Sequence, residues 1–176
     1  KIISIKMDNI YNIGDNFLLR NDVLQELYVS NLKKIGNFFL SRNKTLQTLE
    51  LHDLTEIGVY FLRWNEELRE LYAPKLTKVG NHFLTHNLAL KKLILPNLTE
   101  VGNDFLFCNE VLEELYAPNL TKVGIYFLYY NQALKTIDFP RLTNVGNFFL
   151  FCNKSFKVYL YILKKGMIDK KKRKKR

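Results

Sequence analysis

The fold is decided by a stretch that recurs along the chain, here residues 24–46, LQELYVSNLKKIGNFFLSRNKTL. Its glycine, phenylalanine and asparagine each return every 22 residues without a gap. The glycine column is Gly14, Gly36, Gly58, Gly80, Gly102, Gly124 and Gly146. The phenylalanine column is Phe17, Phe39, Phe61, Phe83, Phe105, Phe127 and Phe149. The asparagine column is Asn21, Asn43, Asn65, Asn87, Asn109, Asn131 and Asn153. A fixed period predicts stacked units that bury their apolar residues against one another, because one unit cannot do so alone.

Short segments in which apolar and polar residues alternate predict one β-strand in each unit. They lie at residues 27–29, 49–51, 71–73 and 93–95. Strands one repeat apart run in the same direction, so we expect a parallel sheet on one face. Prolines that cannot donate to a strand ladder follow the later strands: Pro74, Pro96, Pro118 and Pro140. The opposite stretch, for example residues 81–87, has room for turns or for one or two turns of helix.

Two of the columns have predicted structural roles. We expect each glycine to occupy a turn that requires a positive φ angle. We expect the asparagines to form a buried ladder of side-chain amides, because turns contain backbone groups that no helix or sheet satisfies.

The repeat unit resembles the leucine-rich repeat, and most closely the BspA-like type found in bacterial and protist surface proteins. Residues 118–134, PNLTKVGIYFLYYNQAL, carry the resemblance to the pattern P-x-x-L-x-x-I-G-x-x-x-F-x-x-C/N-x-x-L, in a slightly shorter unit. The resemblance covers about residues 2–160. It implies an α/β solenoid, a leucine-rich-repeat horseshoe with a parallel β-sheet on the concave face and short turns or helical pieces on the convex face.

The net charge of +10 on the 176 residues is concentrated at the C-terminal end. Residues 164–176 carry nine Lys or Arg and one Asp, a net charge of +8, which leaves +2 for the other 163 residues. A block of like charges repels itself and does not fold alone. We therefore expect a solenoid of about seven repeats over residues 2–163 and a disordered polybasic tail over 164–176. The tail ends in Lys170, Lys171, Lys172, Arg173, Lys174, Lys175 and Arg176.

Some variable positions alternate with a period of 44 residues. One such column is Lys34, Glu56, Lys78, Glu100 and Lys122. Stacking would make opposite charges neighbours, since strands in a sheet lie about 4.8 Å apart. Such a column is expected from a charge ladder, whose exposed pairs contribute about 0–1 kcal/mol each. Duplication of a two-repeat unit is the alternative explanation.

The outward position of each predicted strand forms what we call the tyrosine row. Its members are Tyr28, Glu50, Tyr72, Ile94, Tyr116 and Asp138. Aromatic residues mixed with charges are typical of binding surfaces, and repeat proteins commonly bind through this face. We therefore predict that the row contacts a partner, although tyrosine also simply suits a strand. Further aromatic residues gather on the opposite side near the C-terminal end, where packing, docking or a neighbouring repeat would each explain them: Tyr126, Tyr129, Tyr130, Phe148 and Phe151.

The residues with reactive side chains form no catalytic pattern. Cys108 and Cys152 share a column two repeats apart, roughly 9–10 Å by the strand spacing, which exceeds the ~7 Å that a disulfide spans. We predict free thiols. His82 and His86 are four residues apart, a ligand spacing on helices, but no third ligand is near in sequence, so surface histidines are favoured over a metal site. Nucleophile-elbow, phosphate-loop and dinucleotide motifs are missing. We expect no enzyme, no cofactor and no metal.

The favoured function is therefore a non-enzymatic module for protein–protein interaction, and the family resemblance implies cell-surface adhesion or host interaction. The alternative is an intracellular repeat protein whose polybasic tail binds nucleic acid or an anionic membrane, with affinity that falls steeply with salt. A third interpretation is a scaffold that is one piece of a longer array. The residues after Lys1 show no secretory signal, but a processed product or a fragment would also begin this way, so the compartment stays open.

Overall fold

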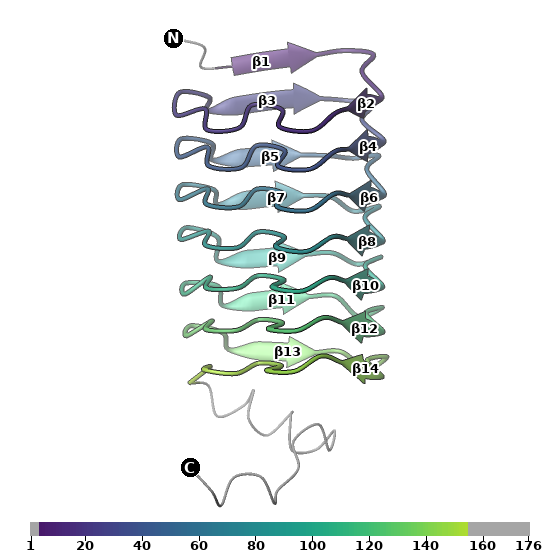
Figure 1. The fold of residues 1–176 in the computed structure, drawn as a ribbon, viewed down its shortest axis with the longest axis vertical. Helices are drawn as coiled ribbons and strands as arrows, with labels where there is room; N and C mark the ends of the chain where they lie inside the picture. The colour runs from purple at the N-terminus through teal and green to yellow at the C-terminus, as the bar shows by residue number, and fades with distance from the viewer. Residues whose placement is uncertain (1–3, 155–176) are drawn as a thin grey trace, which may run out of the picture.

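The computed structural model describes residues 4–154 as a solenoid in which each 22-residue coil adds one strand to each of two parallel sheets (Figure 1). The long-strand sheet contains β1 (Ser4–Met7), β3 (Glu26–Val29), β5 (Thr48–Glu50), β7 (Glu70–Tyr72), β9 (Lys92–Ile94), β11 (Glu114–Tyr116) and β13 (Thr136–Asp138). The short-strand sheet contains β2 (Asn12–Ile13), β4 (Lys34–Ile35), β6 (Glu56–Ile57), β8 (Lys78–Val79), β10 (Glu100–Val101), β12 (Lys122–Val123) and β14 (Asn144–Val145). The predicted solenoid and its parallel sheet are confirmed.

The short-strand sheet was not predicted, because strands of two residues are too short to show an alternating pattern. It contains the column of alternating Lys and Glu residues. Lys34 pairs in register with Glu56, and Glu56 pairs with Lys78. The expected juxtaposition of opposite charges therefore exists, and it lies on the short-strand sheet rather than on the long-strand sheet.

The side of each coil opposite the long-strand sheet contains turns, and residues 4–154 contain no helix. Turns were one of the two predicted forms, and the helical pieces of the expected α/β class do not occur in this range. The reason is an alternating backbone: His82, Leu84 and His86 have φ angles of 59°, 51° and 59°. This conformation directs successive N–H groups to neighbouring coils. The N–H of His82 donates to Asn103 O at 2.8 Å, and that of Leu84 donates to Phe61 O at 3.0 Å.

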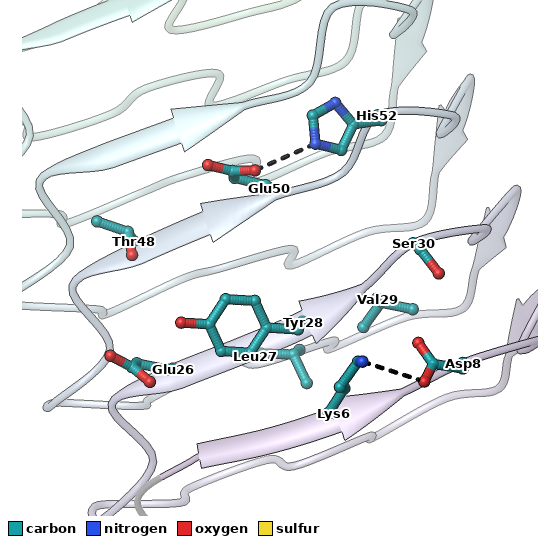
Figure 2. Close-up of a pocket in the computed structure, with 10 residues that line it drawn as sticks. All are labelled: Lys6, Asp8, Glu26, Leu27, Tyr28, Val29, Ser30, Thr48, Glu50 and His52. Carbon is teal, nitrogen blue, oxygen red and sulfur yellow. Dashed lines mark hydrogen bonds and ion pairs between the residues drawn. The ribbon is translucent and has the colours of Figure 1, made fainter.

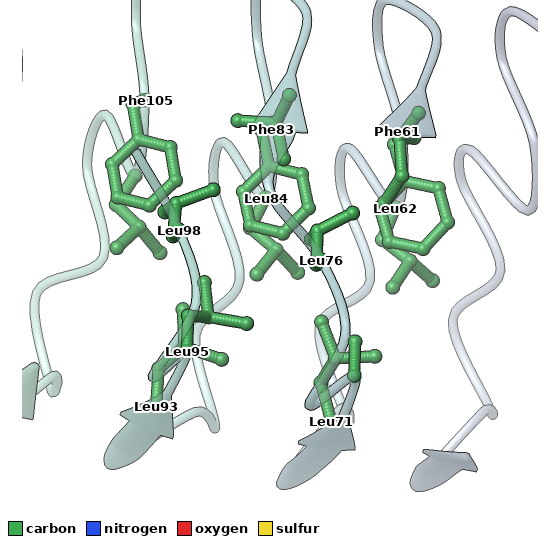
Figure 3. Close-up of a cluster of buried hydrophobic side chains, with 14 of the residues drawn as sticks. Phe61, Leu62, Leu71, Leu76, Phe83, Leu84, Leu93, Leu95, Leu98 and Phe105 are labelled. Carbon is green, nitrogen blue, oxygen red and sulfur yellow. The ribbon is translucent and has the colours of Figure 1, made fainter. Parts of the chain in front are cut away.

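The core consists of ladders of equivalent side chains that run through the stack, and several of these ladders keep one residue type throughout. Phe61, Phe83 and Phe105 are fully buried, and their rings stack with centroids 5.4 and 5.3 Å apart. Figure 3 shows these rings beside the leucines of the adjacent columns, Leu84 and Leu98 among them. Burying one such side chain stabilises the fold by about 1.5–3 kcal/mol. Because most of these columns keep one residue type from coil to coil, the interfaces between coils are similar.

The asparagine column forms the predicted buried ladder of amides. Asn87 is fully buried, and its Nδ2 donates to Leu62 O of the preceding coil at 2.9 Å. Its own backbone N–H donates to Oδ1 of Asn109 in the following coil at 3.1 Å. Equivalent bonds from Nδ2 to the preceding coil are made by Asn43, Asn65, Asn109, Asn131 and Asn153. The asparagines thus satisfy carbonyl groups that the turns leave unpaired.

The predicted role of the glycine column was wrong. None of its seven residues has a φ angle in the left-handed region. The column instead marks a close approach of neighbouring coils: a Cβ at Gly80 would lie 2.8 Å from Gly58 O and 2.9 Å from Gly58 C. A Cβ at Gly14, in the first described coil, would meet nothing within 4 Å. Glycine is therefore required by backbone contact between coils and not by conformation.

This difference provides a matched pair of variants. We expect Gly80→Ala to lower the free energy of unfolding by about 1–3 kcal/mol, because the two backbones must separate to admit the methyl group. Gly14→Ala adds the same methyl group in open space, so its effect should stay within about 0.5 kcal/mol. Urea unfolding followed by circular dichroism measures both values. Equal losses for the two variants would contradict the close-contact explanation.

Candidate functional site

The tyrosine row lies on the exposed face of the long-strand sheet, with one member on each strand from β3 to β13. The register pairs Tyr28 with Glu50, Glu50 with Tyr72, and Tyr72 with Ile94. The remaining pairs are Ile94 with Tyr116 and Tyr116 with Asp138. The six predicted residues therefore stand in one line along the solenoid, and Lys6 of β1 extends the line beyond Tyr28.

The apolar members of the row are unusually exposed. Tyr28, Tyr72, Ile94 and Tyr116 have exposed fractions of 55%, 51%, 47% and 54%. They alternate along each strand with core residues, so that Leu71 is 7% exposed beside Tyr72. Strands that are packed on one face hold the outward side chains in fixed positions. The row is thus a rigid and partly apolar surface.

A hollow of about 290 Å³ lies around Tyr28 (Figure 2). Its charged lining includes Asp8, Glu26 and Glu50, opposed by Lys6. Lys6 pairs with Asp8 at 3.4 Å, whereas Glu26 has no ion-pair partner among the described residues. The negative charge of Glu26 raises the pKa of the Tyr28 phenol above its ordinary value. This end of the row is therefore suited to a positively charged group.

A larger hollow of about 910 Å³ lies over β7 and β9. Its apolar lining comes from the tyrosine row, from two prolines and from two loops beside it: Tyr72, Ile94, Pro74, Pro96, Leu88 and Val111. The two strands pair in register only at Tyr72 and Ile94, whereas β5 and β7 pair at three positions. Lys92 at the rim forms an ion pair with Glu114 at 2.9 Å. The middle of the row therefore offers apolar contact area with charges at its edge.

His52 belongs to this surface, although no sequence motif distinguishes it. Its Nε2 lies 3.1 Å from Glu50 Oε2, and its ring meets Tyr72 edge-on with centroids 5.1 Å apart. It occupies the column that holds proline in later repeats. It lies in the turn two residues after Glu50, the end of β5, so the strand pattern alone does not place its side chain.

The aromatic residues on the turn side stack on one another. Phe107, Tyr129 and Phe151 form one stack, with centroids 5.0 and 5.9 Å apart, and Tyr126 stacks on Phe148 at 4.8 Å. Packing therefore explains much of this group. Among its members, Tyr130, Phe148 and Phe151 remain exposed.

The two histidines of the predicted surface pair belong to similar stacks and do not converge. His82 lies on Tyr60 with centroids 4.3 Å apart, and its Nδ1 is 3.5 Å from Asp104 Oδ2. His86 lies on Trp64 at 4.1 Å, and burial lowers the pKa of its imidazole. Within residues 4–154, no group of three or more His, Cys, Asp or Glu side chains is arranged to hold a metal ion.

The two cysteines are free thiols, as predicted. Cys108 is partly buried, and this burial raises the pKa of its thiol to about 11. Cys152 is exposed, and its Sγ lies 3.6 Å from the Tyr129 hydroxyl oxygen.

The predicted polybasic tail, residues 164–176, lies outside the described residues, and so does the end of the predicted solenoid, residues 155–163. The part of the chain that the structure describes has no helix long and apolar enough to cross a membrane.

The family model "BspA type Leucine rich repeat region" matches residues 1–110 and 102–160, with six copies. No curated protein and no solved structure matches the chain.

The two thiols should differ in reactivity. At about pH 8 we expect Cys152 to react with a disulfide reagent such as DTNB much faster than Cys108, because Cys108 is partly buried and only its thiolate reacts. Absorbance of the released thiolate follows the two phases. Cys152→Ser should remove the fast phase and Cys108→Ser the slow one. A single phase of equal rate for both thiols would contradict the assigned environments.

Proposed function

Since the chain belongs to the BspA-type leucine-rich repeat family, we propose that it is a protein-binding module that engages its partner through the tyrosine row. Repeat solenoids of this kind are interaction scaffolds, because their stacked units present one long continuous surface. Adhesion or contact with a host protein, which the family resemblance implies, is the form of this function that we propose.

The exposed tyrosines are the observation on which this proposal rests. Three of them stand at alternate coils of one sheet face, each about half exposed. Tyrosine supplies a large contact area at a low cost in conformational entropy, and it is enriched among the residues that dominate binding energy. The strands that carry these tyrosines each pair with a strand on both sides, so binding should cost little additional conformational entropy.

The charges around the row support a protein partner rather than a polyanion. Carboxylates outnumber cations at the β3–β5 end, where Glu26 and Glu50 flank Tyr28. Arg69, Lys91 and Lys92 lie at the rim over β7 and β9, where they surround an apolar centre. An apolar centre with a charged rim is the usual anatomy of a protein interface.

Selection from a displayed library of random peptides and small domains would test the proposal. We expect clones selected on the full chain to lose binding to the variant Tyr28→Ala/Tyr72→Ala/Tyr116→Ala. The expected loss is about 2 kcal/mol or more, which is at least about 30-fold in Kd. Biolayer interferometry of purified clones measures it.

A matched control replaces three aromatic residues on the turn side, Tyr60, Tyr126 and Tyr130, by Ala. This variant should still bind the selected clones. A chain lacking residues 164–176 distinguishes binding by the tyrosine row from binding by the tail. Binding that survives this deletion and is insensitive to salt excludes the tail as the binding site. Clones that ignore the first triple substitution and depend on the tail would refute the proposed site.

A further inference from the structure

The spacing of the tyrosines along the row restricts the shape of the partner. Tyr28, Tyr72 and Tyr116 lie on alternate strands, with Glu50 and Ile94 in the gaps between them. Neighbouring strands are about 4.8 Å apart, so successive tyrosines are separated by roughly 9.6 Å. The two gaps have the same separation.

One extended conformation of a peptide repeats at nearly this distance. A polyproline II helix returns to the same face every three residues, with a rise of about 3.1 Å per residue, which gives roughly 9.3 Å. A β-strand repeats on one face at roughly 6.8 Å and an α-helix turn at about 5.4 Å, and neither distance matches. A polyproline II segment along the solenoid axis therefore places every third side chain in successive gaps.

The two gaps differ in chemistry. The gap at Glu50 adjoins the smaller hollow, whose lining also includes the carboxylates of Glu26 and Asp8. Lys6 pairs with Asp8, whereas Glu26 has no ion-pair partner among the described residues and Glu50 pairs there only with His52, so carboxylate charge at this gap is available to a cation from outside. The gap at Ile94 opens into the larger hollow, where Tyr72, Pro74 and Pro96 provide apolar walls. The first gap thus suits an arginine or lysine, and the second suits an aliphatic side chain or proline.

We propose that the tyrosine row binds a polyproline II segment of its partner, in which a basic residue lies three positions from an aliphatic residue or proline. This inference rests on the proposed function and specifies the partner at that same site. The free carbonyl groups of a polyproline II backbone would accept hydrogen bonds from the tyrosine hydroxyls. Such a segment is already extended in solution, so it loses little conformational entropy on docking.

Two pairs of fluorescein-labelled octapeptides test the proposal in anisotropy titrations with the full chain. PPRPQLPP places leucine three residues after arginine, and PPRPLQPP has the same composition with leucine two residues after it. PPLQPRPP and PPQLPRPP form the equivalent pair in the reverse direction. We expect the spacing of three to bind at least about tenfold more tightly than the spacing of two, in at least one direction.

Variants of the chain then test which side chain of the peptide binds in which gap. Tyr72→Ala should weaken the preferred peptide at least about tenfold, whereas Tyr126→Ala on the turn side should not. Glu50→Arg should weaken the preferred peptide and should improve binding of the same peptide with glutamate in place of arginine. Replacing the prolines of the preferred peptide by glycine should also weaken binding, because glycine does not maintain the polyproline II conformation.

Equal affinities within both pairs, or no binding of any peptide up to about 1 mM, would overturn the inference. The proposed function fails on a different result, namely library clones whose binding does not depend on the three tyrosines. Clones that depend on the three tyrosines but lack this spacing would support protein binding by the row and would exclude a polyproline II partner.

Discussion

Backbone hydrogen bonds between one coil and the next are the constraint on which the rest of this molecule depends. They occur on every side of the coil. Thr77 N–H donates to Thr55 O at 2.9 Å, Gly80 N–H to Ile57 O at 3.2 Å, and Leu84 N–H to Phe61 O at 3.0 Å. Because the whole coil is held at hydrogen-bonding distance from its neighbour, each side chain must stack on its equivalent 22 residues away. The constant glycine, phenylalanine and asparagine columns are consequences of this stacking.

Much of the architecture could be predicted from the sequence, because a periodic core leaves a periodic pattern. The parallel sheet, the asparagine ladder and the free thiols follow from spacing and residue type alone. The short-strand sheet and the role of glycine could not be predicted in this way. Strands such as Lys78–Val79 are too short to show a pattern, and a glycine that avoids a backbone contact looks the same in sequence as one with a positive φ angle. Only the neighbouring coil distinguishes these two roles, and a single repeat does not contain it.

The strands contain positions that repeat in every coil and positions that vary between coils. Inward positions of the strands scarcely change between coils, while outward positions change from tyrosine to glutamate or isoleucine. The outward residues contribute little to the core, so they are available for recognition. The order of the row was predictable, since strands one repeat apart pair without a shift. The larger hollow beside it was not predictable, because it lies where β7 and β9 pair at a single position and is lined in part by loop residues such as Leu88. His52 was missed for a related reason, since its contact with Glu50 joins two columns.

Residue-resolved hydrogen exchange in the native state tests whether hydrogen bonds join the coils on every side. The amides of Leu62, Leu84 and Leu106, on the turn side, should be protected as strongly as those of Gly80 and Gly102 beside the short-strand sheet. All five donate to a carbonyl of the preceding coil at 3.0–3.2 Å, so all should exchange through the same cooperative openings. Rapid exchange of the three leucine amides while the glycine amides remain protected would show that the turn side is an ordinary loop, and would contradict a solenoid joined on every side.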